Sequence, residues 1–192
     1  MLNIRQGQRL AKFQLSGRVQ ILLVIACFLG TILLGWSVLK TRFYRAAIPA
    51  EIEITFSLAT TGSSMSIWEA ALPLRPKACG GAIFELSNTT IAAIRDRGLD
   101  ALNDARQGRG YADKTDQLFY YYSYKPWQPT PVPSQWTSQG MWYGLSCMNL
   151  GYGFGQSIVE AAQVPGSFYT TGLSKILVII PSLKLAVFTY TS

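Results

Sequence analysis

An uncharged apolar run over residues 19–39 constrains this chain more than any other part of its sequence. It reads VQILLVIACFLGTILLGWSVL, contains no proline, and lies between Arg18 and Lys40. At a rise of about 1.5 Å per residue, a helix of this run is about 31 Å long. The hydrocarbon core of a bilayer is about 30 Å thick, and a helix satisfies its own backbone hydrogen bonds in lipid. The run therefore predicts a single transmembrane helix.

Two other structures use apolar runs of this kind. A secretory signal peptide has a shorter apolar core, of about 7 to 15 residues, followed by a cleavage site of small residues. Cleavage near Ala46 and Ala47, or at Ala50, is therefore one alternative. The other is the core helix of a soluble domain, but no other segment of this sequence is apolar enough to surround such a helix. The transmembrane interpretation is preferred because the run and its basic leader are both long.

The basic residues are concentrated beside the apolar run. Seven of the 17 Lys and Arg residues precede the first acidic residue, Glu51, and they account for the whole net charge of +7. The part after residue 50 is neutral, whereas a nucleic-acid-binding domain would carry the basic patch itself. Basic residues beside a span set its orientation and attract anionic lipid. Four precede the span and three follow it, so we expect a cytoplasmic N-terminus, an extracytoplasmic (periplasmic) C-terminal domain, and no nucleic-acid partner.

These patterns divide the chain into four parts. They are a basic N-terminal segment (1–18), the transmembrane helix (19–39), a juxtamembrane linker (40–50) and an extramembrane domain (51–192). The domain contains an aromatic and proline-rich stretch over 118–142.

Local patterns predict a small α+β fold for the domain. Apolar and polar residues alternate over 51–58, which is typical of a half-buried strand. Residues 88–107 have helical periodicity, with Ser87 or Asn88 as the cap. Two β-rich runs, 175–180 and 185–191, predict a C-terminal hairpin. The glycines at 151, 153 and 155 indicate a loop or a strand edge. The expected fold class is a single-pass membrane protein, with one transmembrane α-helix followed by an antiparallel sheet and one amphipathic helix.

The stretch 118–142 combines aromatic residues with four prolines that exclude a continuous helix. An extended arm of this composition can lie along another protein, because rings bury a large area at low entropic cost. The alternative is that the rings cover the core of their own domain. The interface candidates are Trp127, Trp136, Trp142, Tyr120, Tyr121, Tyr122 and Tyr124.

Small residues within the span indicate where a second helix could approach. Ala26 and Gly30 are four residues apart, as are Thr31 and Gly35, and this spacing permits close helix packing in membranes. Cys27 lies in the same segment and is interpreted as a packing residue. Cys79 and Cys147 lie in the domain, where they form either one disulfide, in an oxidising compartment, or two separate thiols.

The sequence contains no histidine, which restricts its chemistry severely. Histidine is the commonest general base and metal ligand, and no C-x-x-C motif or phosphate loop is present either. Asp96, Asp100 and Asp104 recur at helical spacing, but a solvated helix face usually has this composition. We therefore predict no catalytic residues, no metal, no cofactor and no small-molecule substrate.

Three functions follow from these observations, in decreasing order of support. The first is a non-catalytic accessory subunit that stabilises a larger membrane complex, for example a respiratory or photosynthetic light-harvesting or reaction-centre assembly. Its partners would be integral membrane subunits and lipids. The second is a membrane-anchored envelope module that binds glycan or cell-wall material through exposed aromatic residues. The third is a membrane-anchored enzyme that uses carboxylates or a Ser-Lys pair.

Overall fold

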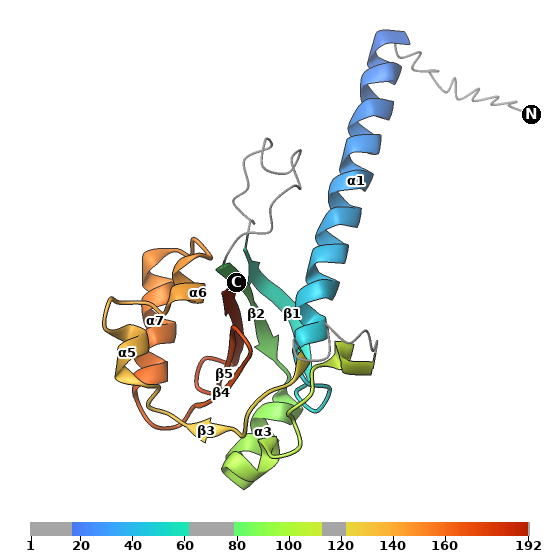
Figure 1. Cartoon of the computed structure of the whole chain (residues 1–192). Coiled ribbons are helices and arrows are strands. Elements are labelled where there is room, and N and C mark those ends of the chain that lie inside the picture. Colours follow the sequence, from blue (N-terminus) through green and yellow to red (C-terminus); the bar gives the residue numbers. More distant parts are fainter. Residues whose placement is uncertain (1–16, 62–78, 113–121, 192) are drawn as a thin grey trace, which may run out of the picture. The chain divides into compact units, whose positions relative to one another are not determined.

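The computed structural model describes residues 17–61, 79–112 and 122–191 (Figure 1). The chain divides into two compact units, Met1–Leu39 and Lys40–Ser192. The basic segment 1–18 lies almost wholly outside the described residues, as do Tyr120 and Tyr121.

Helix α1 (Gly17–Ala47) contains the apolar run. Its portion Val19–Ala47 is long and apolar enough to cross a membrane, by length and composition. Large apolar side chains on it are between 62% and 68% exposed, namely Ile21, Leu22, Val24, Phe28, Leu33 and Leu34. The predicted linker 40–50 is helical for most of its length, because α1 continues to Ala47. The reason is that Tyr44 and Ala47 are buried in the core of the second unit, which fixes this last part of the helix.

Six strands form one antiparallel sheet within the described residues. They are β1 (Ile54–Thr60), β2 (Cys79–Leu86), β3 (Gln128–Pro129), β4 (Phe168–Gly172), β5 (Lys175–Ile180) and β6 (Leu185–Thr191). Their order in the sheet is β1-β2-β6-β5-β4-β3. The predicted antiparallel sheet and its C-terminal hairpin are confirmed, with Lys175 opposite Tyr190 and Ile180 opposite Leu185. Strand β2 was not predicted, although it pairs with both β1 and β6.

The predicted alternation of buried and exposed residues over 51–58 holds only for the first half of this segment. Ile52 and Ile54 are buried, as the pattern predicts, but Phe56 and Leu58 are 57% and 46% exposed. The pairing of β1 with β2 shifts register between Ile54 and Ser57 and again between Ser57 and Ala59. Such shifts change which face a strand residue occupies, so the alternation does not continue beyond Ile54.

Helices pack on both faces of the sheet. They are α3 (Asn88–Arg97), α5 (Ser134–Thr137), α6 (Tyr143–Ser146) and α7 (Tyr152–Gln163), with 3-10 turns η1 (Gly98–Leu102) and η2 (Arg109–Ala112). The single helix predicted over 88–107 is wrong beyond Arg97, because Gly98 adopts a φ of +57° and ends α3. The loop or strand edge predicted at 151–155 is also wrong, since Gly151 is the N-cap of α7 and Tyr152 begins the helix.

The sheet therefore separates two apolar cores (Figure 1). On one face, α3, the end of α1 and residues 122–127 pack against side chains such as Phe84 and Phe188. On the other face, α6 and α7 pack against Ile83, Val178 and Val187. Because the sheet is covered on both sides, its central strands are apolar on both faces. This explains why KILVII in β5 is continuous and does not alternate.

Candidate binding site

Most of the predicted aromatic surface lies inside the domain. Tyr122, Tyr124, Trp127 and Trp142 are between 2% and 6% exposed. Their polar atoms are hydrogen-bonded within the chain. Tyr124 Oη donates to the carbonyl of Ala47 at 2.8 Å, Trp127 Nε1 to that of Ala105 at 2.8 Å, and Trp142 Nε1 to Thr189 Oγ1 at 3.0 Å. These four rings cover the domain's own core, and their place at an interface stays a prediction.

Trp136 is the remaining described member of that set, and it lines an open pocket. The pocket has a volume of about 600 Å³ and lies at α5, α6 and the start of β5. Its lining residues are Gln135, Trp136, Ser138, Gln139, Met141, Trp142, Tyr143, Ser146 and Ile176. The ring of Trp136 is half-buried and packs edge-on against Tyr169, with ring centroids 5.2 Å apart. This contact fixes one wall of the pocket.

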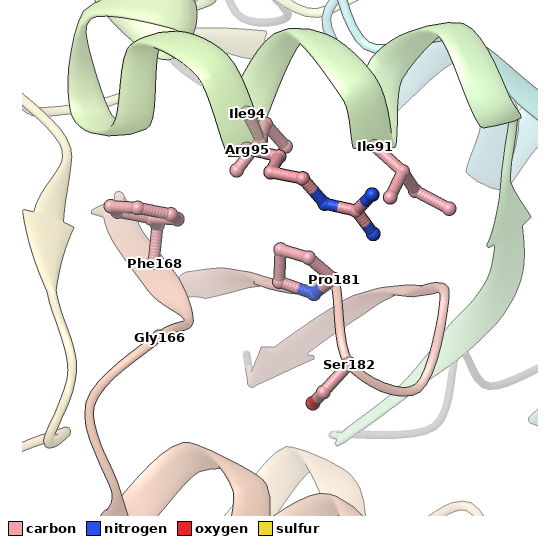
Figure 2. Close-up of a pocket in the computed structure, with 7 residues that line it drawn as sticks. All are labelled: Ile91, Ile94, Arg95, Gly166, Phe168, Pro181 and Ser182. Carbon is pink, nitrogen blue, oxygen red and sulfur yellow. The ribbon is translucent and has the colours of Figure 1, made fainter.

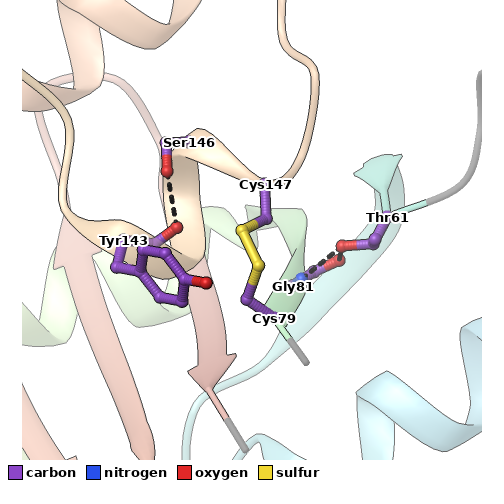
Figure 3. The surroundings of a disulfide bond; sticks show 6 residues. All are labelled: Thr61, Cys79, Gly81, Tyr143, Ser146 and Cys147. Atoms are coloured by element: carbon purple, nitrogen blue, oxygen red, sulfur yellow. Dashed lines mark hydrogen bonds between the residues drawn. A yellow bond between two sulfur atoms is a disulfide. The ribbon is translucent and has the colours of Figure 1, made fainter. Parts of the chain in front are cut away.

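The second wall is tied to the sheet by a disulfide (Figure 3). Cys79 in β2 is bonded to Cys147, the residue that follows α6, with Cα atoms 5.9 Å apart. Figure 3 shows Tyr143 and Ser146 in the helical turn that leads to Cys147. Buried Trp142 precedes this turn and Met148 follows the disulfide, so α6 is held at both ends. Tyr143 lies between these anchors and is 63% exposed.

The polar groups of the pocket are neutral. Among the described residues that line it none is charged. Ser138 Oγ donates to the carbonyl of Gln135 at 3.2 Å and Ser146 Oγ to that of Tyr143 at 2.7 Å. Both hydroxyl oxygens keep acceptor capacity. The side-chain amides of Gln135 and Gln139 are exposed and make no hydrogen bond to another described residue.

Sequence reasoning missed most of this pocket. It selected tryptophans and tyrosines across 118–142, but the glutamines, the serines and Tyr143 were not among its candidates. A local signal is present, because Gln135–Tyr143 reads QWTSQGMWY and places neutral hydrogen-bonding side chains between aromatic rings. The sequence could not show which of these rings are buried in the core of the domain.

A smaller hollow of about 360 Å³ lies on the other face of the sheet (Figure 2). Its walls are mainly apolar, with Ile91 and Ile94 from α3, Phe168 from β4, and Pro181 from the β5–β6 turn. Figure 2 shows the guanidinium of Arg95 reaching toward Pro181. Ile91 and Ile94 also belong to the adjoining core. This hollow is therefore a surface extension of that core, with a single exposed cation beside it.

Lys175 is the most unusual titratable residue of the domain. It is 3% exposed, and its Nζ lies 4.5 Å from the centroid of the Tyr124 ring. Burial lowers the pKa of this ammonium group to about 7. The cation–π contact favours the charged form and opposes this effect. Lys175 lies opposite Tyr190 in the β5–β6 hairpin, and the ring of Tyr190 packs with those of Tyr44 and Phe188.

The small residues predicted to contact a second helix are mostly exposed on α1. In α1, Ala26, Thr31 and Gly35 are exposed and Gly30 is half-buried; Thr31 Oγ1 donates to the carbonyl of Phe28 at 2.7 Å. Cys27 is an exposed free thiol. Whether these small residues contact another helix stays a prediction.

The acidic residues do not converge on a site. Asp96 lies in α3, Asp100 in η1 and Asp104 beyond it, and all three are exposed. Asp100 accepts a hydrogen bond from Asn103 Nδ2 at 3.1 Å. Within the described part of the chain, no group of three or more metal-binding side chains was found.

Comparison of the chain with protein-family models, with curated proteins and with solved structures gave no match.

Proposed function

We propose that this protein is a non-catalytic accessory subunit, anchored in a membrane by α1, whose folded domain contacts and stabilises a larger membrane protein complex. Its partners are integral membrane subunits and lipids. The N-terminus is cytoplasmic and the domain is extracytoplasmic. The type of assembly, respiratory or photosynthetic, stays a prediction from the sequence.

The observation that carries this proposal is the exposure of apolar side chains around α1. Ile21, Val24, Phe28 and Leu34 are between 62% and 68% exposed, and none of the most apolar window of the helix is buried. In water, this much contiguous apolar surface is strongly unfavourable. A bilayer removes it from water without any change in the helix, because lipid requires only that backbone polar groups are paired.

The disulfide supports an extracytoplasmic domain. Disulfides persist in oxidising compartments and are rare in the reducing cytosol. The Cys79–Cys147 bridge links the start of β2 to the residue that follows α6. Together with the four basic residues that precede the span, it favours the orientation with the N-terminus inside.

The edge strand β1 offers the domain a surface for contact with a partner. Phe56 and Leu58 are two residues apart on β1, which is the first strand of the sheet order, and both are strongly exposed. Exposed apolar residues on an edge strand favour association with another protein. An integral membrane subunit with an apolar flank near the membrane surface matches this chemistry.

The test is purification of the full chain from its native membranes in mild detergent, at native abundance, with mass spectrometry of the proteins that accompany it. We expect the chain to migrate in native gels with larger integral subunits. Recovery only as a free monomer would remove the proposal.

A matched pair of variants locates the contact. Phe56→Ser with Leu58→Ser is expected to release the chain from its partners. Leu173→Ser, which changes a 70% exposed leucine in the β4–β5 turn, is expected to leave the complex intact. Equal loss from both variants would place the contact elsewhere on the domain.

The envelope-module alternative loses most of its basis. It relied on Trp127, Trp136, Trp142 and the tyrosines of 118–142, and of these Trp127, Trp142, Tyr122 and Tyr124 are buried. Only Trp136, in the open pocket, is left among the described tryptophans of that set.

A further inference from the structure

We propose that the pocket between α5 and α6 is a binding site for a neutral saccharide. This inference goes beyond the accessory role and does not depend on it, because a subunit can hold a glycan whether or not it stabilises a complex. The site consists of Trp136, Tyr143, Gln135, Gln139, Ser138 and Ser146.

The size and walls of the pocket fit a short oligosaccharide. Its volume of about 600 Å³ lies within the range of about 300–1,000 Å³ that is usual for small-molecule sites. A pyranose ring has one face of C–H groups, which packs well on an aromatic ring that is apolar on its face and polar at its tip. Trp136, which is half-buried, and Tyr143, which is 63% exposed, supply such rings to the lining of the pocket.

The polar groups of the pocket can form the hydrogen bonds that sugar hydroxyls require. A hydroxyl group donates one hydrogen bond and accepts others, so it pairs best with groups that do both. The amides of Gln135 and Gln139 each have an acceptor oxygen and two N–H donors, and neither is engaged by another described residue. The oxygens of Ser138 and Ser146 donate to backbone carbonyls and are left to accept from a ligand hydroxyl.

The absence of charge selects against other ligand classes. Phosphate and carboxylate ligands are usually held by Arg or Lys, because a desolvated anion needs a compensating cation. No described lining residue is charged. Nucleotides, sugar phosphates and acidic peptides are therefore expected to bind worse than neutral sugars of the same size.

The pocket is preorganised, which reduces the entropic cost of binding. Trp142 is 2% exposed and its indole N–H is bonded to Thr189 in β6. The disulfide fixes the other end of α6 to β2. On α5, Thr137 Oγ1 accepts a hydrogen bond from Gln163 Nε2 of α7 at 2.9 Å. The turns that present Trp136 and Tyr143 are thus attached to the sheet and to α7.

The test is isothermal titration of the full-length protein with chitotetraose and with maltotetraose. The detergent is a polyoxyethylene ether, because maltoside detergents carry a sugar that would compete. We expect saturable binding of at least one oligosaccharide, with a Kd of about 1 mM or tighter, and at least tenfold weaker binding of the same oligosaccharide carrying a phosphate group. No saturable binding of either oligosaccharide would overturn the proposal, and so would tighter binding of the phosphorylated sugar.

Variants of the lining residues test whether the saccharide binds in this pocket. Trp136→Ala is expected to abolish binding, and Gln135→Ala with Gln139→Ala to weaken it about tenfold, since two or more hydrogen bonds are lost. The two glutamines are exposed, so their removal leaves the fold intact. Tyr152→Ala, which removes an 81% exposed tyrosine of α7, is the matched control and is expected to leave the affinity unchanged. An affinity that is unchanged by the double glutamine variant would overturn the assignment.

Discussion

At the residue scale, Lys175 shows how a charged side chain is accommodated in an aromatic core. It begins β5 and is almost fully buried, with its ammonium group over the face of Tyr124. Burial lowers its pKa from 10.5 to about 7. At neutral pH the folded protein therefore holds this lysine close to the midpoint of its titration, in contrast to a surface lysine.

This lysine predicts a dependence of stability on pH. Between about 7 and 10.5 the side chain is mostly neutral when folded and protonated when unfolded, so unfolding takes up a proton. The free energy of unfolding should therefore rise with pH across this range, by at most about 1.4 kcal/mol per pH unit, and level off below pH about 7. Chemical denaturation at several pH values measures it. Lys175→Met should flatten the slope, whereas Lys125→Met, at an exposed position, should keep it. An identical slope in the Lys175 variant would contradict this account.

Arg109 stabilises the turn between α1 and β1. Its guanidinium donates to the carbonyls of Ile48 at 3.1 Å and Ile52 at 2.8 Å, and its backbone N–H also donates to Ile48 at 3.0 Å. Desolvation on partial burial lowers the pKa of this group, followed by the charge of Arg45.

Removing this side chain takes its donor from the carbonyl of Ile52 and one of two donors from that of Ile48, which keeps the backbone N–H of residue 109. Arg109→Ala is expected to lower the free energy of unfolding by about 1–3 kcal/mol. Arg97→Ala, at an exposed arginine, serves as the control and should change it little. Thermal or urea unfolding of the two variants gives the comparison, and equal stabilities would show that these hydrogen bonds contribute nothing net.

At the element scale, α3 begins at a polar network that extends across the chain. Ser87 Oγ accepts from the backbone N–H of Thr90 at 3.1 Å and donates to Glu53 at 3.1 Å, while Thr89 Oγ1 also donates to Glu53. These hydroxyls, first that of Thr89 and then that of Ser87, lower the pKa of Glu53. The network connects the helix start to the residue that precedes β1.

Ser87→Ala is expected to cost about 1 kcal/mol of stability, which is typical of a lost N-cap. It should also raise the pKa of Glu53 toward its ordinary value, because one of the hydroxyls that favour the carboxylate is removed. Carboxyl chemical shifts followed through an acid titration by NMR report the pKa directly. A pKa of Glu53 that stays as low as in the wild type would contradict the role given to Ser87.

The disulfide supports both the sheet and the candidate pocket. Cys79 and Cys147 are 68 residues apart in the sequence. In the chain-entropy description, closing a loop of this length stabilises the fold by about 4 kcal/mol. Cys79→Ser with Cys147→Ser should lower the free energy of unfolding by an amount of this order. Urea denaturation of oxidised wild type and of the double variant checks it, and a difference within error would assign the bridge no structural role.

At the scale of the whole molecule, the sequence predicts those elements that its hydrophobic periodicity and its local composition determine. The apolar run in α1, the C-terminal hairpin and the Ser87 cap all depend on local patterns, and the structure contains each of them. Strand β2 was missed because Gly80 and Gly81 resemble a loop. The structure gives a different reason for them, since a Cβ at Gly81 would lie 2.1 Å from the carbonyl oxygen of Phe188. Gly81 thus permits close approach of the β6 backbone, and Gly80 leaves room for the side chain of Thr61.

The candidate pocket could be predicted less well than the fold. Aromatic residues over 118–142 have the same composition whether they face a partner or a core. Only tertiary packing distinguishes Trp142, which is 2% exposed, from Tyr143, which is 63% exposed and is its neighbour in the chain. Likewise, the neutral charge of the pocket results from the meeting of α5, α6 and β5, which no local pattern specifies.

The central claim is that α1 lies in lipid and carries a domain that works by contact. Extraction of native membranes with alkaline carbonate, followed by immunodetection of the full-length chain, tests it most directly. This treatment removes peripheral proteins and leaves proteins with a transmembrane helix in the membrane pellet. We expect the whole chain, including the residues of α1, to remain in the pellet. Release of the chain into the supernatant, or recovery only of a form that begins after residue 47, would contradict the claim.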